Sequence, residues 1–399
     1  MKRLAMPVLL LLLLICAAQA CGADALTLAA ATDLHVNPAY QTVGLINPLE
    51  PVHLQIVDAF LWDAQRNGVD VVLLLGDITN QGRVAQHELL IEKLRAAQAA
   101  GLRVLVLPGN HDIGEVGTSE FAQLYAEFGY SDAYSRDDVS LSYTVRVGDR
   151  LFLLLDTHGY EGQRDSASIS RGTLVWMGQQ LAVAKENDWQ VIAAGHYPMI
   201  TEHSTPFTGR EEALRLFEAY GVELYLSGHL HKRCVTAKDG LTELVVDQTI
   251  AYPCCYARLT FSDDGAIAYQ PSAIAVSQWA AENGVQDANL RAFDAYQTAL
   301  EKERSASVVE RIRRDREVAP EDLQQAKDFF WLMTDCRAHG TLSRYADALR
   351  HHPGYELMVD LSVGTIYERW IPKTINTAVP YTTGFELRDG VLTEGSREE

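Results

Sequence analysis

Short hydrophobic runs alternate with longer stretches of helical periodicity over the first two thirds of the chain. The runs at 26–32, 69–75 and 103–107 are almost continuously apolar, which is typical of strands buried on both faces. Between them, residues 51–67 and 84–100 place their hydrophobic side chains at the spacing of one helical face. Strand, helix, strand, helix, strand gives two β-α-β crossovers, so the pattern predicts a largely parallel sheet.

The same mixture continues to residue 269. Residues 140–157 predict a β-hairpin with Gly148 and Asp149 in its turn. Three further helices are predicted, at 120–128, 173–185 and 211–220. Five further strands are predicted, at 191–194, 222–226, 241–246, 256–261 and 266–269.

The pattern changes after about residue 273, where strand signals nearly vanish until the last thirty residues or so. Helices are predicted at 275–283, 289–304, 307–314, 320–336 and 342–350. The chain therefore divides into a mixed α/β domain at 21–272 and a mainly helical C-terminal region at 273–399. The sequence leaves open whether this region caps a site or braces the domain.

The first twenty residues have the organisation of an export signal. Lys2 and Arg3 precede an apolar run at 8–18, which is too short for a transmembrane helix of about 20 residues. The following Ala18-Gln19-Ala20-Cys21 fits a signal-peptidase site and also resembles a bacterial lipobox with Cys21 lipidated. We expect an exported protein, either a cell-envelope lipoprotein anchored through Cys21 or a periplasmic or secreted protein.

An exported protein meets an oxidising compartment, which permits disulfides. Four cysteines follow Cys21, and four cysteines allow three pairings that sequence alone does not resolve. We expect Cys234 to pair with one of the adjacent residues Cys254 and Cys255, whereas buried free thiols, including Cys336, are the alternative.

The net charge of −19 restricts the partners of the chain. Such acidity argues against nonspecific binding of duplex nucleic acid, which requires Lys and Arg to replace counterions. An anionic small molecule stays compatible, because bound divalent metals reverse the sign of the local field.

Polar clusters stand where the predicted strands end, and ligands bind beyond the carboxyl ends of strands in open α/β sheets. Five such clusters occur: Asp33-x-His35, Gly76-Asp77, Gly109-Asn110-His111-Asp112, Gly195-His196 and Gly228-His229-x-His231. Their mixed nitrogen and oxygen donors favour Mn, Fe, Zn, Co or Ni over Ca or Mg. No cysteine belongs to the set, so a structural zinc site is not expected.

Seven of the twelve histidines lie outside these clusters. Two of them, His158 and His203, follow predicted strand ends and are weaker candidates for substrate contacts. The others fall within or at the ends of helical patterns and are expected to have only structural or surface roles: His53, His87, His339, His351 and His352.

The five clusters, in this order, resemble those of the calcineurin-like metallophosphoesterase superfamily, over residues 26–261. The resemblance implies a four-layer α/β/β/α sandwich with two metals at one end. It assigns one metal to Asp33, His35 and His231, the other to Asn110, His196 and His229, and the bridging position to Asp77. By the same resemblance His111 contacts the scissile phosphate and protonates the leaving group, while Asp112 supports the loop.

The expected activity is hydrolysis of a small-molecule phosphoester by a metal-bridging hydroxide, and phosphodiesters are the favoured substrates. Hydrolysis of phosphomonoesters or nucleotides is the alternative. Purple acid phosphatases have a tyrosine three residues after the bridging aspartate, where this chain has Asn80, and a glycine where it has His35. A non-catalytic metal-binding scaffold is less favoured, because such a protein would be expected to lack a ligand or the acid histidine.

Overall fold

The computed structural model describes residues 25–39, 47–158, 166–377 and 380–395 of the chain. The predicted signal segment and Cys21 lie outside these residues. Within the described part, no helix combines the length and the apolar character that a membrane span requires.

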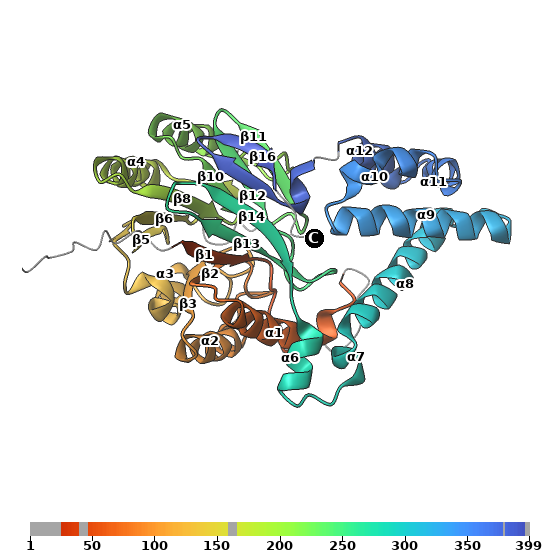
Figure 1. Cartoon of the computed structure of the whole chain (residues 1–399), viewed down its shortest axis with the longest axis horizontal. Coiled ribbons are helices and arrows are strands. Elements are labelled where there is room, and N and C mark those ends of the chain that lie inside the picture. Colours follow the sequence, from red (N-terminus) through yellow and green to blue (C-terminus); the bar gives the residue numbers. More distant parts are fainter. Residues whose placement is uncertain (1–24, 40–46, 159–165, 378–379, 396–399) are drawn as a thin grey trace, which may run out of the picture.

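Two seven-stranded sheets form the centre of the molecule (Figure 1). The strands of the first sheet, in order across it, are β16 (Val391–Glu394), β15 (Phe385–Arg388), β14 (Ile267–Ala273), β13 (Cys255–Phe261), β1 (Leu26–Ala31), β2 (Val71–Leu75) and β3 (Arg103–Leu107). Strands β1, β2 and β3 run parallel, as the two crossovers predict. Strand β13 joins β1 in the antiparallel sense and connects the later strands to them.

The second sheet contains the predicted hairpin and the strands that follow it. Its order is β11 (Cys234–Lys238), β12 (Leu241–Val245), β10 (Leu224–Ser227), β8 (Gln190–Gly195), β6 (Arg150–Leu155), β5 (Tyr143–Val147) and β4 (Ser135–Arg136). The short pair β7 (Ala167–Ser168) and β9 (Phe207–Thr208) forms a separate parallel ribbon.

Helices cover the outer face of each sheet, which completes the four layers of the α/β/β/α sandwich (Figure 1). Helices α1 (His53–Arg66) and α2 (Val84–Ala99) lie against the first sheet, and α4 (Arg171–Glu186) and α5 (Arg210–Tyr220) against the second. A short helix, α3 (Thr118–Leu124), precedes β4. All five residues of β2 are buried, and each buried Val or Leu side chain contributes about 1.5–3 kcal/mol.

The C-terminal region is mainly helical, as predicted, but its helices differ from the expected ones. Its elements are α6 (Val276–Glu282), α7 (Ala288–Arg291), α8 (Phe293–Arg313), α9 (Pro320–Ala338), α10 (Leu342–Arg350), α11 (Gly354–Ser362) and α12 (Tyr367–Asn376). The separate helices predicted at 289–304 and 307–314 were wrong, because α8 runs through Ser305. That serine is buried, and its hydroxyl lies 3.2 Å from the hydroxyl of Thr334 on α9.

Helices α11 and α12 and strand β11 were not predicted. The turn signals at Pro353 and Gly354 concealed the start of α11, where Gly354 lies so close to α9 that a Cβ atom would collide with the backbone of Gln325. After α12 the chain returns to the sandwich, since β15 pairs with β14. The helical region therefore lies between two strands of the first sheet in the sequence.

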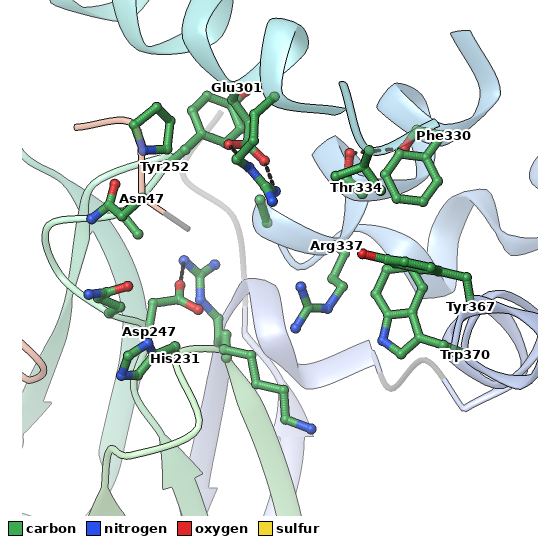
Figure 2. A pocket seen from close by; sticks show the side chains of 18 of the residues that line it. Asn47, His231, Asp247, Tyr252, Glu301, Phe330, Thr334, Arg337, Tyr367 and Trp370 are labelled. Atoms are coloured by element: carbon green, nitrogen blue, oxygen red, sulfur yellow. Dashed lines mark hydrogen bonds and ion pairs between the residues drawn. The ribbon is translucent and has the colours of Figure 1, made fainter. Parts of the chain in front are cut away.

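A contact between Tyr252 and helix α9 fixes the helical region against the sandwich. The hydroxyl of Tyr252, in the loop after β12, donates to Asp335 Oδ1 over 2.6 Å. Figure 2 shows the cavity beside this contact, with Asp247 and His231 on the sandwich side and Arg337 on the α9 side. Side chains of the two regions thus face each other across one cavity.

The four cysteines of the described chain are free thiols. The expected bond between Cys234 and Cys254 or Cys255 is therefore not formed. Cys234 begins β11 in the second sheet, whereas Cys255 begins β13 in the first and Cys254 belongs to the core packed around that sheet. Cys234 therefore lies in a different sheet from Cys255, and it bonds to neither of the two adjacent cysteines.

Candidate metal centre

The ends of β1, β2, β3, β8 and β10 meet at one edge of the sandwich, where main-chain hydrogen bonds join their loops. The N–H of Asp33 donates to the carbonyl of Gly76 over 3.1 Å, and that of His35 to Asp77 over 2.9 Å. The N–H of Gly228 donates to the carbonyl of His196 over 2.9 Å. The polar clusters that the sequence places at strand ends are therefore brought together.

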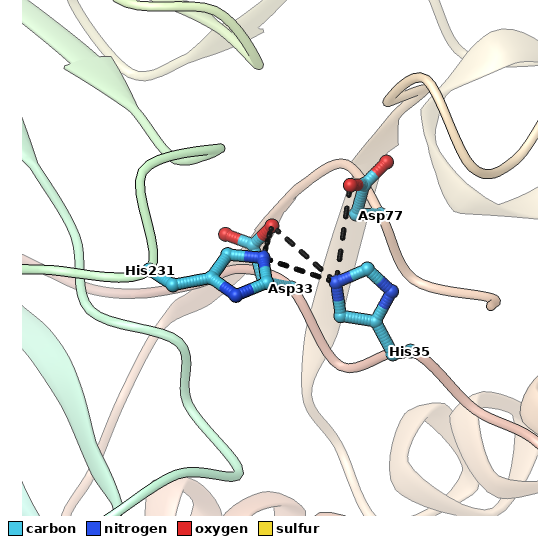
Figure 3. A group of neighbouring side chains, drawn as sticks. All are labelled: Asp33, His35, Asp77 and His231. Atoms are coloured by element: carbon cyan, nitrogen blue, oxygen red, sulfur yellow. Dashed lines mark hydrogen bonds and ion pairs between the residues drawn. The ribbon is translucent and has the colours of Figure 1, made fainter. Parts of the chain in front are cut away.

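Asp33, His35, Asp77 and His231 form one group, in which the potential ligand atoms all lie within 4.8 Å of one another (Figure 3). His231 Nε2 lies 3.1 Å from Asp33 Oδ1 and 3.2 Å from His35 Nε2. His35 Nε2 lies 3.9 Å from Asp77 Oδ2. Two imidazole nitrogens and two carboxylates therefore face one point.

Asp77, His196 and His229 form a second group by the same criterion. His196 Nε2 lies 3.3 Å from Asp77 Oδ2. The amide oxygen Oδ1 of Asn110 adds a fourth donor, 3.1 Å from His196 Nε2 and 3.2 Å from His229 Nδ1. Asp77 belongs to both groups, so its carboxylate occupies the position that a bridging ligand requires.

Five of these side chains stand on backbone with positive φ. The angles are 54° at Asp33, 42° at His35, 48° at Asp77, 67° at His229 and 50° at His231. A residue other than glycine in this region costs about 1–3 kcal/mol, so it persists only where the surroundings hold it. The fold thus stabilises strained backbone at five of the seven candidate ligands.

The predicted ligand set fits a metal pair in its chemistry. Three oxygen donors and four imidazoles converge, and nitrogen and oxygen donors of this kind suit transition metals. His35 and His231 turn their Nε2 atoms toward each other at 3.2 Å. A metal ion between them would accept a lone pair from each of these two nitrogen atoms.

Burial and charge set the protonation of these candidate ligands. Burial alone would raise the pKa of Asp33, but the charge of His231 and its hydrogen bond hold that pKa at about 2. Burial lowers the pKa of His35 and of His229 to about 4, which leaves both imidazoles neutral. Burial opposes charge on His196, yet Asp77 raises its pKa to about 9, so metal binding there would release a proton.

His111 lies at the border of this centre. Its N–H donates to Asp77 Oδ1 over 2.7 Å, and its ring Nδ1 donates to the carbonyl of Asn80 over 2.7 Å. The other ring nitrogen, Nε2, lies 4.0 Å from Asp77 Oδ2, and 35% of the side chain is exposed. The ring therefore borders the centre on a side that is open to solvent.

Asp112 holds two of the loops together from beneath. Its buried carboxylate accepts from the backbone N–H groups of Thr79 and Gly109, each over 2.8 Å, and from Ile78 over 3.3 Å. Burial, reinforced by the charge of Asp77, raises the pKa of Asp112 to about 6. These bonds tie the loop of Asp77 to the loop of Asn110 and His111.

The sequence profile of calcineurin-like phosphoesterases matches residues 26–233, which contain all seven candidate ligands. The chain belongs to the calcineurin-like phosphoesterase family. This membership agrees with the four-layer sandwich and with the expectation of a phosphoester hydrolase.

Similar proteins include serine/threonine-protein phosphatase CPPED1 of Homo sapiens, 27% identical over 178 residues that cover 42% of this chain and 53% of that protein. Tartrate-resistant acid phosphatase type 5 of Rattus norvegicus is 30% identical over 139 residues, 32% of this chain and 42% of that protein. The chain thus matches about half the length of these curated relatives. A dimetal phosphatase from Danio rerio shares 13% identity and a TM-score of 0.49, covering 63% of this chain and 96% of that one.

Among the remaining histidines, His203 lies beside this phosphoesterase centre. Its ring centroid is 6.2 Å from that of His229, and its Nε2 lies 3.0 Å from the carbonyl of Pro198. His158 is buried at the end of β6. His53 and His87 have the structural roles expected of them, and His87 contacts Tyr125 and the carbonyl of Asp112.

Glu243 is a supporting residue that was not predicted from the sequence. It lies on β12 and is fully buried, and its carboxylate accepts from the backbone N–H groups of Met199, Ile200 and Thr201. These amides belong to the loop that follows His196. An acidic residue inside the apolar strand Leu241–Val245 was the available signal.

We expect Glu243→Gln to lower the free energy of unfolding by about 1–3 kcal/mol, because one acceptor oxygen becomes a donor and leaves a buried N–H without a partner. Urea unfolding measures the change. Glu386→Gln, at an exposed position of strand β15, is the matched control and should stay within about 0.5 kcal/mol of wild type. Equal effects of the two substitutions would contradict the supporting role of Glu243.

Proposed function

We propose that the chain is a dimetal phosphoester hydrolase that acts on phosphodiesters. The observation that carries the proposal is the position of Asp77, which belongs to both candidate ligand groups and also accepts the N–H of His111. One carboxylate therefore links both groups to the residue expected to act as the acid. A bound metal pair supplies positive charge for the phosphate oxygens and an activated water.

The chain's own residues account for orientation and proton transfer. Asn80 accepts from Nδ1 of His111, so this nitrogen keeps its proton and the ring is held with Nε2 toward the centre. When Nε2 is protonated, it donates to the leaving oxygen as the ester bond breaks. Such general acid catalysis contributes about 10²–10⁴ in rate.

The preference for diesters rests on two positions. Asn80 and His35 differ from the tyrosine and glycine expected of purple acid phosphatases. Hydrolysis of phosphomonoesters is the second candidate. It is favoured by the similarity to a protein named as an acid phosphatase, tartrate-resistant acid phosphatase type 5, which is 30% identical over 139 residues.

The test compares bis(p-nitrophenyl) phosphate with p-nitrophenyl phosphate, in the presence of Mn, Fe, Zn, Co or Ni. We expect at least about tenfold higher kcat/KM for the diester, corresponding to about 1.4 kcal/mol in transition-state binding, and loss of activity after chelation. Asp77→Asn protein, purified in parallel, controls for contaminating hydrolases. Turnover confined to the monoester would overturn the diester proposal, and no turnover with any metal would overturn the hydrolase proposal.

A further inference from the structure

A cavity of about 520 Å³ lies between the metal-site edge of the sandwich and helices α8, α9 and α12 (Figure 2). His231, a candidate ligand of the first metal group, is one of its lining residues. The cavity is therefore adjacent to the candidate metal centre, and His231 belongs to both. A substrate larger than one phosphate group, held at that centre, would have this cavity beside it.

Cationic side chains outnumber acidic ones in the cavity lining. The cations are Lys232, Arg233, Arg304 and Arg337, and the acids are Asp247 and Glu301. Both acids are already paired, Asp247 with Arg233 and Glu301 with Arg304. Two positive charges are thus left over, in a chain whose net charge is −19.

Arg337 carries one of these charges. In the described part of the chain, no ion pair joins its guanidinium to a carboxylate, and the group lies 5.8 Å from the centroid of the Trp370 ring. Figure 2 shows it reaching from α9 toward the cavity. Burial lowers the pKa of Arg337. Arginine nevertheless remains charged, so a half-buried cation is left for an anion to pair with.

An aromatic and apolar wall stands beside Arg337. Tyr367 and Trp370 are half-buried and pack edge to face, with ring centroids 5.7 Å apart. Ile366 lines the same cavity and is 83% exposed. An arginine next to aromatic rings suits a ligand with a planar ring and a charged oxyanion.

The position of this wall is fixed relative to the metal-site edge. Asp335, two residues before Arg337 on α9, accepts from Tyr252 of the sandwich and lies 3.3 Å from Nδ1 of His339. Arg233 Nη1 also donates to the carbonyl of Thr382 over 3.3 Å, beyond the last helix. The cavity is therefore bounded by two regions that are tied together on both sides.

We propose that this cavity binds the part of the substrate remote from the scissile ester, with a second phosphate at Arg337 and Lys232 and a nucleobase against Tyr367 and Trp370. The substrate class is then a nucleotide that carries at least two phosphate groups. The inference rests on the proposed function, because the first phosphate occupies the metal centre.

Binding is tested by calorimetric titration of the metal-loaded protein with two non-hydrolysable ligands, a nucleoside bisphosphonate and the matching nucleoside monophosphonate. We expect the bisphosphonate to bind wild type at least about tenfold more tightly, since charge-assisted hydrogen bonds to Arg are strong. Arg337→Gln should remove this advantage. Arg344→Gln, on the exposed side of α10, removes the same charge from the same region and should preserve it.

The outcomes separate the two proposals. Equal affinity of wild type for both ligands would overturn the cavity assignment, and so would an advantage that survives in Arg337→Gln. Hydrolysis of bis(p-nitrophenyl) phosphate by the same preparation reports on the metal centre alone. Hydrolysis of this diester together with equal binding of the two phosphonates would support the proposed function and contradict the cavity assignment. Tighter binding of the bisphosphonate without hydrolysis of the diester would support the cavity assignment and contradict the proposed function.

Discussion

Asp77→Asn should reduce the metal content of the purified protein to less than one ion per chain and lower kcat/KM for a diester by at least about 10³, because it weakens both ligand groups at once. Asp77 is the one residue shared by the two groups, and its Oδ2 lies 3.3 Å from His196 Nε2 and 3.9 Å from His35 Nε2. The amide of asparagine keeps the shape and the bond to the His111 N–H, but it lacks the negative charge that a shared position between two cations requires.

The matched control is Asp70→Asn, the same substitution at the other end of the same strand. Asp70 is exposed and accepts from the N–H of Thr27 over 2.7 Å, far from the ligand groups in the register of β2. Elemental analysis and diester turnover should both match wild type for this control. A full complement of metal in Asp77→Asn, with wild-type turnover, would show that Asp77 bridges nothing.

The strands and helices of the sandwich were predictable because short, continuous stretches of the sequence determine them. All five residues of β2 are apolar and buried, and β3 is apolar and buried from Val104 onward, as expected for parallel strands covered on both faces. Each candidate ligand follows such a run by only a few residues. Parallel strands deliver their carboxyl ends to one edge, and this rule alone brings Asp33 and Asp77 together.

The positive-φ backbone beneath these ligands was not predictable in the same way. Alternate residues of an extended chain point to the same side, but Asp33 and His35 both have left-handed backbone, with φ of 54° and 42°. Hydrogen bonds between neighbouring loops impose this geometry, and a sequence pattern does not contain them.

The helical region shows what depends on distant contacts. The bond between Tyr252 and Asp335 joins residues 83 positions apart, and the cavity at Arg337 exists only because of such contacts. The stretch 301–317 is rich in charged residues, yet Glu301 is buried and pairs with Arg304 at the cavity. Helical periodicity identifies α9, whereas the surface that α9 faces follows from the packed molecule.

The second large effect is expected at His111, where removal of the ring should slow one class of substrate far more than another. His111→Ala should lower kcat by about 10²–10⁴ for diesters with alkyl leaving groups, because an alkoxide needs a proton as it departs. The loss should be less than about tenfold for p-nitrophenyl diesters, since nitrophenolate leaves without protonation. Steady-state kinetics on the two series measure the difference.

Metal content should stay at the wild-type level in His111→Ala, because the ring of His111 belongs to neither ligand group and the bond from its backbone N–H to Asp77 remains. His351→Ala is the control, since this imidazole is 77% exposed on the helical region. Equal losses for alkyl and nitrophenyl esters in His111→Ala would assign the ring to phosphate binding instead of proton transfer. The dependence on the leaving group is therefore the decisive readout, because both roles predict a slower enzyme and only the acid predicts that the deficit grows with the basicity of the departing oxygen.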